Sequence, residues 1–552
     1  MDRSEHFKII CGGGLNANEN HLKLSDESTG AATRLLNFEP SLFGGYRRIN
    51  GYVKFDSDYP EVGDHTSNAN TAEGKVYGLS YYKNEGIDNP YVIAARKDQG
   101  ANTYSYWYHT PLIGWRKFTS ASYQALTLAT TNGSYDVEKV RSVQFDFGDG
   151  PMICFVDGIN PAVIFDGTDW YQLESSNTGG TSSPGGDQVI DAPSVVEVFE
   201  NHLFLSGDRT AQSVVCHSAG TDVMTWTSAA GGGQIFGGFK VVNIKPFRDN
   251  LFVFGENGIR KVTVDQNNFV IDNVTSNVGC VAADSVVEIG GDLMFLAPDG
   301  FRPVSGTARI GDVELETISK PIQGLLVDIV KDEDLSTLTA VVVRSKSQVR
   351  YFYGDSTRSQ QNSLGLVGGL VQSGTQISWE FGQLQGIRSS CCTSEYVDFE
   401  EFVLHGDYDG IVYRQEIGNT FNGADITATY STPYLEMSDT IERKTIKSVD
   451  TFVKSEGAFE VGISVAFDWG NPNAAIPVSY SAEGGSLYVA YAGDGISYGA
   501  SSLVYGESTA PVISTNIEGS CKSIRLTYTS VGNINPYTIQ GIVIEYVKSG
   551  RR

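Results

Sequence analysis

One hairpin pattern, repeated along the chain, constrains the fold more than any other feature. In its clearest copy, at residues 249–264, the apolar run 251–254 is followed by the turn sequence Gly-Glu-Asn-Gly. Asn and Gly tolerate positive φ, so this sequence favours a tight turn. Apolar and polar residues then alternate from Ile259 to Val264, which is typical of a half-buried strand. The stretch therefore predicts a β-hairpin.

Variants of this hairpin recur along the first three quarters of the chain. They lie at residues 153–167, 202–215, 292–304, 349–360 and 401–414, with a weaker copy at 89–107. The spacing between copies, about 40–65 residues, is close to that of propeller blades. An isolated two-stranded hairpin is not stable in water, so the copies need flanking strands and each other. The series predicts a β-propeller of about six to eight blades. Unrelated hairpins in an ordinary β-protein are the alternative.

Composition and strand length indicate an all-β chain of several units. The 552 residues suffice for about two or three domains, and Gly, Tyr, Phe, Thr, Ser and Val dominate while helical periodicity is scarce. Residues 1–56 predict an extended N-terminal arm ending in a β-meander, and residues 57–419 the propeller-like body. Longer alternating strands in residues 420–552 predict a C-terminal β-sandwich or jelly roll. Tryptophans, roughly one per repeat, are expected to fill gaps between blades, and the low-complexity loop 175–188 to be exposed.

Charge and cysteine usage exclude several classes of protein. A net charge of −25 disfavours a protein that grips DNA phosphates. An acidic wall could still enclose sliding DNA, and solubility alone explains the same charge. No apolar run approaches the roughly 18 residues of a membrane span, so no membrane partner is expected, and the N-terminus lacks the apolar core of a secretory signal. The seven cysteines are scattered without a CxxC pair, which predicts reduced core thiols rather than disulfides or zinc ligands.

Three acidic sequences have the residue types of a calcium site, because calcium favours carboxylates two residues apart on a turn. None has the order of an EF-hand loop, and Asp-Gly at a hairpin normally serves backbone geometry. We therefore interpret them as structural turns and expect no metal and no cofactor. The candidates are Asp56, Asp58 and Asp64 with His65; Asp146, Asp149 and Gly150; and Asp407, Asp409 and Gly410.

Several familiar catalytic signatures are missing. The sequence lacks the P-loop, HExxH and the sialidase Asp-box. Glu400 and Glu401 are adjacent, so on a strand they point to opposite faces, whereas the two carboxylates of a glycosidase face each other across a cleft. We therefore expect no catalytic site and no enzyme.

Three segments resemble one family of proteins. They are NFEPSLFGGYRRINGYVKF (37–55), TDVMTWTSAAGGG (221–233) and NPYTIQGIVIEYVKSGRR (535–552). They are similar to the packaged-DNA stabilisation or tail nozzle proteins of short-tailed bacteriophages. The resemblance implies a propeller body in a hexameric ring that extends the portal and adaptor channel and conducts double-stranded DNA. It also implies a place in the virion, at the tail or head-to-tail junction, after synthesis in the bacterial host cytoplasm, with fibre, needle or spike proteins as further partners.

Two functional hypotheses follow. In the first, the chain is a structural ring subunit that retains packaged DNA and conducts it during ejection, with acidic side chains lining the bore. In the second, it is a receptor- or polysaccharide-binding tail propeller, either an adhesin or a depolymerase. The mark of the second would be a concave face with clustered aromatic side chains and carboxylates. Tyr-Gly pairs at 498–499 and 505–506 and the basic end at 551–552 suit protein interfaces in either case.

Overall fold

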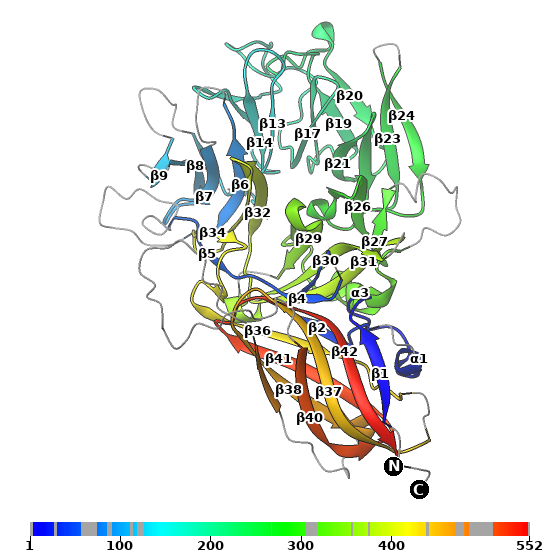
Figure 1. Cartoon of the computed structure of the whole chain (residues 1–552). Helices are drawn as coiled ribbons and strands as arrows, with labels where there is room; N and C mark the ends of the chain where they lie inside the picture. The colour runs from blue at the N-terminus through cyan, green and yellow to red at the C-terminus, as the bar shows by residue number, and fades with distance from the viewer. Residues whose placement is uncertain are drawn as a thin grey trace.

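Nearly all regular secondary structure in the described part of the chain is β (Figure 1). The computed structural model describes residues 4–26, 30–42, 44–56, 74–84, 91–110, 114–118, 126–265, 268–304, 317–354, 357–373, 376–437, 441–470, 480–484 and 512–549. A ring of small sheets lies at one end and a two-sheet sandwich at the other. The expected all-β, propeller-like fold is confirmed. Within the same residues, no helix is long and apolar enough to cross a membrane.

The hairpin at residues 249–264 forms the two middle strands of one blade. Strand β22 (Asn250–Gly255) pairs antiparallel with β23 (Ile259–Asp265). Leu251 and Val253 pack towards the preceding sheet, while Phe252 and Phe254 pack towards the following one. Because both faces of β22 are covered, its four apolar residues are consecutive rather than alternating.

Seven sheets of this kind follow one another in the described residues, and we number them as blades one to seven. Blades two, three, four, six and seven have four strands each, and blade five has three. Blade one consists of β6 (Val76–Tyr82), β7 (Tyr91–Lys97), β8 (Thr103–Thr110), β9 (Gly114–Lys117) and β10 (Thr127–Ala129), and blade two of β13 (Arg141–Phe145), β14 (Met152–Val156), β15 (Val163–Phe165) and β16 (Trp170–Gln172). Blade three consists of β17 (Val195–Phe199), β18 (His202–Ser206), β19 (Val214–His217) and β20 (Gly233–Phe236), blade four of β21 (Val241–Phe247), β22, β23 and β24 (Asn268–Thr275), and blade five of β25 (Val287–Ile289), β26 (Asp292–Ala297) and β27 (Gly300–Pro303). Blade six consists of β28 (Thr339–Val343), β29 (Gln348–Tyr353), β30 (Leu364–Ser373) and β31 (Gln376–Gln385), and blade seven of β32 (Cys391–Val397), β33 (Glu400–Gly406), β34 (Val412–Gln415) and β5 (Tyr52–Lys54).

The first strands of these sheets close a ring. Strands β6, β13, β17 and β21 contact one another in turn, and β28, β32 and β6 do the same on the other side. Between them, the short 3-10 turn η2 (Ala283–Ser285) precedes β25 and contacts both β21 and β28. The last blade is completed from the N-terminal part of the chain, because β5 pairs antiparallel with β34. This pairing covers the edge of β34 and ties the N-terminal part of the chain to the last blade, while the outer strands of other blades remain as short edges.

Aromatic side chains fill the space between blades, as expected of the tryptophans. Trp170 of blade two stacks on Phe165 with ring centroids 4.6 Å apart. It also stacks on Tyr106 of blade one, at 4.9 Å. All seven cysteines are free thiols, and six of them are buried.

The second unit is a β-sandwich built from both ends of the chain. One sheet has the order β3-β4-β42-β37-β40, with β1 also paired to β42, and the other joins β36, β41, β38 and β39. The two sheets meet through a buried core, in which the ring of Phe459 stacks on that of Tyr537 at 4.8 Å. The strands are β1 (Glu5–Ile10), β3 (Phe38–Pro40), β4 (Tyr46–Arg48), β36 (Ala424–Ser431), β37 (Lys444–Ser455), β38 (Phe459–Phe467), β39 (Tyr480–Gly484), β40 (Val512–Cys521), β41 (Ile524–Gly532) and β42 (Tyr537–Lys548).

Smaller elements connect the two units. Strand β2 lies between β31 of blade six and β36 of the sandwich, so one sheet runs from the propeller into the sandwich. The N-terminal segment follows this seam: Gly14 has a φ of 67°, and a Cβ on it would lie 2.7 Å from the backbone nitrogen of Phe381. Glycine at this position therefore lets the segment lie directly on β31. These elements are β2 (Arg34–Leu36), β35 (Thr420–Phe421), α1 (His21–Asp26) and α3 (Gln323–Asp332), with a small hairpin of β11 (Thr131–Asn132) and β12 (Tyr135–Asp136) in the propeller.

A buried ion network stands at this seam. The carboxylate of Glu39, whose side chain is 1% exposed, lies 3.0 Å from Arg350 Nη2 and 2.8 Å from Arg47 Nη1. Lys346 Nζ lies 2.7 Å from the same carboxylate, and Glu416 pairs with both Lys346 and Arg350. The network joins β3 and β4 of the sandwich to β29 of blade six.

Candidate functional site

A cavity of about 210 Å³ opens between blades two and three. It lies beside the last residue of β13. This is the side of the ring on which the first strand of the blade ends, opposite the side on which the first strands begin. Its wall includes residues from four connections: 145–152 and 166–171 of blade two, Thr181 of the low-complexity loop, and 221–224 of blade three. The lining residues are Phe145, Phe147, Asp149, Met152, Asp166, Tyr171, Thr181, Thr221, Asp222, Val223 and Met224.

One part of this wall is aromatic. Phe145 and Phe147 lie with ring centroids 5.0 Å apart and ring planes inclined by 32°. Tyr171 donates its hydroxyl hydrogen to Asp166 Oδ2 at 3.2 Å. Burial, and then the neighbouring Asp166 carboxylate, raises the pKa of Tyr171. The phenol therefore stays neutral and acts as a hydrogen-bond donor at neutral pH.

The other part carries three carboxylates with different surroundings. Asp166 Oδ1 accepts hydrogen bonds from the backbone nitrogens of Thr168 and Asp169, both at 2.7 Å, which shapes the turn before β16. Asp222 Oδ1 accepts one from the backbone nitrogen of Met224 at 3.0 Å. The exposed carboxylate of Asp149 has no hydrogen bond or ion pair with any residue that the structure describes. Asp149 and Asp222 therefore keep carboxylate oxygens that can accept hydrogen bonds from a ligand.

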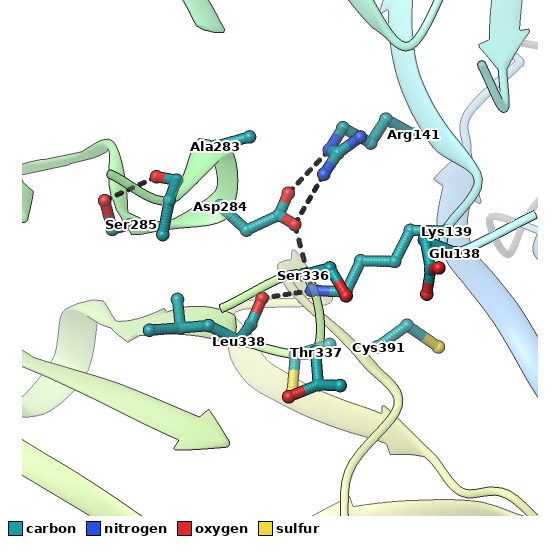
Figure 2. Close-up of polar contacts among 12 residues, drawn as sticks. Glu138, Lys139, Arg141, Ala283, Asp284, Ser285, Ser336, Thr337, Leu338 and Cys391 are labelled. Atoms are coloured by element: carbon teal, nitrogen blue, oxygen red, sulfur yellow. Dashed lines mark hydrogen bonds and ion pairs between the residues drawn. The ribbon is translucent and has the colours of Figure 1, made fainter. Parts of the chain in front are cut away.

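A cluster of three charged side chains occupies the opposite end of the ring (Figure 2). Arg141 binds Asp284 in a bidentate pair, with Nε at 2.7 Å from Oδ1 and Nη2 at 2.8 Å from Oδ2. Lys139 Nζ lies 2.9 Å from Asp284 Oδ2 and also donates to the backbone oxygen of Leu338. Arg141 Nη1 donates to the backbone oxygen of Ser194 at 2.9 Å. Each of these residues lies at or just before the start of a first strand, so the cluster ties blades two, three, five and six together.

The electrostatics of this cluster indicate a structural role. Burial acts to raise the pKa of Asp284, but the charges and hydrogen bonds of Arg141 and Lys139 outweigh it and hold that pKa well below its usual range. The carboxylate is thus permanently ionised and its oxygens are occupied by the two cations. A group in this state does not take up a proton near neutral pH, and three of its roughly four acceptor sites are already used by Arg141 and Lys139.

Two of the aspartates singled out in the acidic turns, Asp146 and Asp407, serve backbone geometry. Asp146 Oδ1 accepts hydrogen bonds from the backbone nitrogens of Gly148 at 2.8 Å and Gly150 at 3.3 Å. Asp407 Oδ1 accepts hydrogen bonds from the backbone nitrogens of Asp409 and Ile411 at 2.8 and 2.9 Å. Within the described ranges, no three His, Cys, Asp or Glu side chains are grouped as metal ligands would be.

Other predicted residues have different outcomes. Asp56 Oδ2 lies 2.8 Å from His109 Nε2, which gives this carboxylate a protein partner. Glu400 forms an ion pair with Arg414, while Glu401 accepts a hydrogen bond from the backbone nitrogen of Arg344 at 2.7 Å. Asp58, Asp64 and His65, the Tyr-Gly pairs at 498–499 and 505–506, and the basic end at 551–552 lie outside the described residues.

Sequence reasoning missed the cavity between blades two and three. Asp149 was considered only as a calcium ligand, and the loop 175–188 only as an exposed segment. In the structure this loop is held against blade three, since Gly185 donates its N–H to Met224 at 2.9 Å and accepts one from Trp226 at 2.9 Å. The alternation of Phe145 and Phe147 around Asp146 was the available signal, because it places two aromatic rings on one side of a strand end.

Comparison with known proteins finds likeness in fold only. No family model and no curated protein matches the sequence. The extracellular domain of a one-component system from B. thetaiotaomicron matches with a TM-score of 0.35 at 8% identity, over 71% of this chain and 41% of that one. An ancestral GH74 enzyme matches with a TM-score of 0.36 at 11% identity, over 68% of this chain and 54% of that one. The chain thus spans about half, or less, of the length of these two structures.

A glycoside hydrolase family 43 arabinoxylan arabinofuranohydrolase from Bacillus subtilis also matches, with a TM-score of 0.24 at 9% identity, over 90% of this chain and all of that one. Two of these three structures are glycoside hydrolases. The expectation that the chain is not an enzyme rested on missing motifs. It is wrong, because glycoside hydrolases are among the structures that match. TM-scores this low identify neither a family nor a reaction.

Proposed function

We propose that this chain is a carbohydrate-binding β-propeller whose cavity between blades two and three holds one sugar unit of a polysaccharide or receptor glycan. The observation that carries the proposal is the lining itself. Phe145, Phe147 and Tyr171 supply apolar ring faces, and Asp149 and Asp222 supply hydrogen-bond acceptors, within one concave site. A sugar ring presents the matching chemistry, with C–H groups on its faces and hydroxyl groups at its rim.

The size of the cavity supports a single ring. At about 210 Å³ it is smaller than the roughly 300–1,000 Å³ of sites that enclose drug-sized ligands. One monosaccharide unit would therefore lie in the cavity while the rest of a glycan chain extends over the surface. Affinity for one unit is expected to be weak, in the millimolar range of about −4 kcal/mol, so strong binding requires several copies of the protein or of the ligand.

A glycan array and a matched pair of variants test this proposal. Phe147→Ala removes one ring of the cavity wall, whereas Phe236→Ala removes an aromatic side chain that is 61% exposed on β20 and is not part of the wall. We expect the wild type and Phe236→Ala to bind the same glycans and Phe147→Ala to lose at least about 80% of the signal, equivalent to about 1 kcal/mol. Release of reducing ends from bound polysaccharides, measured in the same samples, tests for cleavage. Absence of any glycan binding by the wild type contradicts the proposal.

A second function, that of a head-to-tail conduit, is favoured by one specific observation. Two of the segments that resemble tail nozzle proteins come from opposite ends of the chain and lie side by side, since β4 pairs with β42 and Tyr46 lies opposite Ile539. This supports the proposal that the resemblance reflects one shared sandwich unit rather than chance matches. The proposal includes a hexameric ring in the virion, contact with portal, adaptor, fibre and needle proteins, and passage of double-stranded DNA through an acidic bore.

Native mass spectrometry with negative-stain imaging tests the conduit. A closed ring with an opening wide enough for duplex DNA supports it, and a compact trimer contradicts it. If the protein is a monomer alone, the same measurements are repeated with portal and adaptor proteins of a short-tailed phage. Failure to form a ring on that platform also counts against the conduit.

A further inference from the structure

The cavity between blades two and three has charge of one sign only. Its wall carries three aspartates and, among the described residues, no Lys, Arg or His. Several buried or half-buried carboxylates elsewhere in the protein have a basic partner, such as Glu39 with Arg350 and Asp284 with Arg141. A ligand here meets uncompensated negative charge.

Two of these carboxylates have capacity left for a ligand. Asp149 makes no polar contact with the described residues, and Asp222 uses one oxygen for the backbone nitrogen of Met224. Asp166 is different, since the turn and Tyr171 occupy both its oxygens. All three carboxylates contribute negative potential, and the acceptor capacity left for a ligand lies mainly on Asp149 of blade two and Asp222 of blade three.

The rest of the wall suits a cation. Aromatic ring faces attract ammonium groups through their quadrupole, and the effect grows when water is excluded. Phe145, Phe147 and Tyr171 provide such faces, and Met152 and Met224 add polarizable thioethers. Carboxylates and aromatic rings in one cavity form the combination that stabilises a protonated amine more than a neutral hydroxyl or a second carboxylate.

We propose that the sugar unit bound in this cavity carries a free, protonated amino group, as in an unacetylated hexosamine, and that acidic sugars are excluded. This rests on the proposed carbohydrate-binding function and narrows its ligand class. The net charge of −25 acts in the same direction, because a strongly acidic protein repels polyanionic glycans at a distance.

Isothermal titration calorimetry of the full chain tests the inference with four probes: glucosamine oligomers, N-acetylglucosamine oligomers of the same length, oligogalacturonate and choline. We expect the glucosamine oligomers to bind roughly tenfold more tightly than the acetylated ones, the sum of a cation–π contact and a partly exposed ion pair. Their affinity should fall as pH rises through about 8, where an amine beside electron-withdrawing groups loses its proton as an α-amino group does, and as salt screens the charges.

A matched pair of variants locates the effect. Asp149→Asn removes the exposed carboxylate of the cavity while preserving its shape, and Asp272→Asn makes the same change on the exposed strand β24, away from the cavity. We expect Asp149→Asn to reduce the preference for the free amine at least threefold and Asp272→Asn to leave it unchanged. Equal effects of both variants would mean that only the overall charge matters, which overturns the inference.

The probes separate this inference from the function on which it rests. Equal binding of the free and acetylated oligomers, or binding of oligogalacturonate, overturns the inference and leaves carbohydrate binding intact. Binding of choline without any sugar overturns carbohydrate binding and leaves a cation site. No binding of any probe by the wild type overturns both.

Discussion

Replacement of Asp284 by Asn should destabilise the propeller more than any surface substitution. The change leaves the side chain's shape but removes the negative charge between Lys139, whose side chain is 5% exposed, and Arg141, which is 25% exposed. Removal of one partner of a buried pair costs about 3–5 kcal/mol, because the remaining charge stays buried without compensation. Arg141 retains some contact with water, so we expect the lower end of that range, about 3 kcal/mol.

Urea unfolding followed by tryptophan fluorescence measures this loss, with Glu256→Gln as the control. Glu256 pairs with Lys240 at 2.7 Å, but both side chains are 52% exposed, and such surface pairs contribute only about 0–1 kcal/mol. Because the pKa of Asp284 is held below its usual value, its contribution is complete above about pH 4 and is lost as pH falls further. The deficit of Asp284→Asn should therefore be constant from pH 5 to 8 and shrink in acid. A deficit no larger than that of Glu256→Gln would refute the reasoning.

Three further predictions concern buried charges. Glu39→Gln should lower the unfolding free energy by about 2–4 kcal/mol, because Arg350, which is 2% exposed, loses one of its two carboxylate partners and keeps Glu416. Calorimetry of the full chain measures this loss. Burial lowers the pKa of His405 to about 3. As pH drops below about 6.5, the imidazole of the unfolded chain is protonated while that of the folded chain stays neutral, so the unfolding free energy falls. His405→Phe should therefore reduce the number of protons taken up on unfolding at pH 5 by about one. Burial raises the pKa of Asp407 to about 6, so its folded form disfavours the charge and stability falls as pH rises from about 4 to 6. Asp407→Asn keeps an acceptor for the backbone nitrogens and should be more stable than the wild type at pH 7 by about 1–3 kcal/mol in the same unfolding assay.

Much of the propeller could be predicted from local pattern. The hairpin at 249–264 corresponds to β22 and β23, and the one at 401–414 to β33 and β34. The copy at 349–360 is different, since β29 ends at Tyr353 and β30 begins at Leu364, so a longer connection replaces the tight turn. Gly354 directly follows β29, as the sequence predicted. A glycine indicates that a turn begins but does not determine how long the connection is.

The candidate site could be predicted far less well. The cavity between blades two and three combines a strand end, two turns and a low-complexity loop that are up to about 80 residues apart. Their side chains meet only because adjacent blades pack face to face. No periodicity in the sequence marks such residues, since each has a separate local role: Asp166 shapes a turn and Phe145 ends a strand.

The sequence by itself determined that the chain is all-β, that hairpins recur at blade-like spacing and that its cysteines are reduced, because alternation, turn residues and composition act over a few neighbouring positions. Tertiary structure decided which strand closes the ring, how many blades it has and where charges meet. Strand β5 pairs with β34 across more than 350 residues, and Asp284 meets Arg141 across 143. Such pairings depend on the register and packing of whole sheets, and a strand's own side chains specify only which of its faces is buried, not which partner it takes.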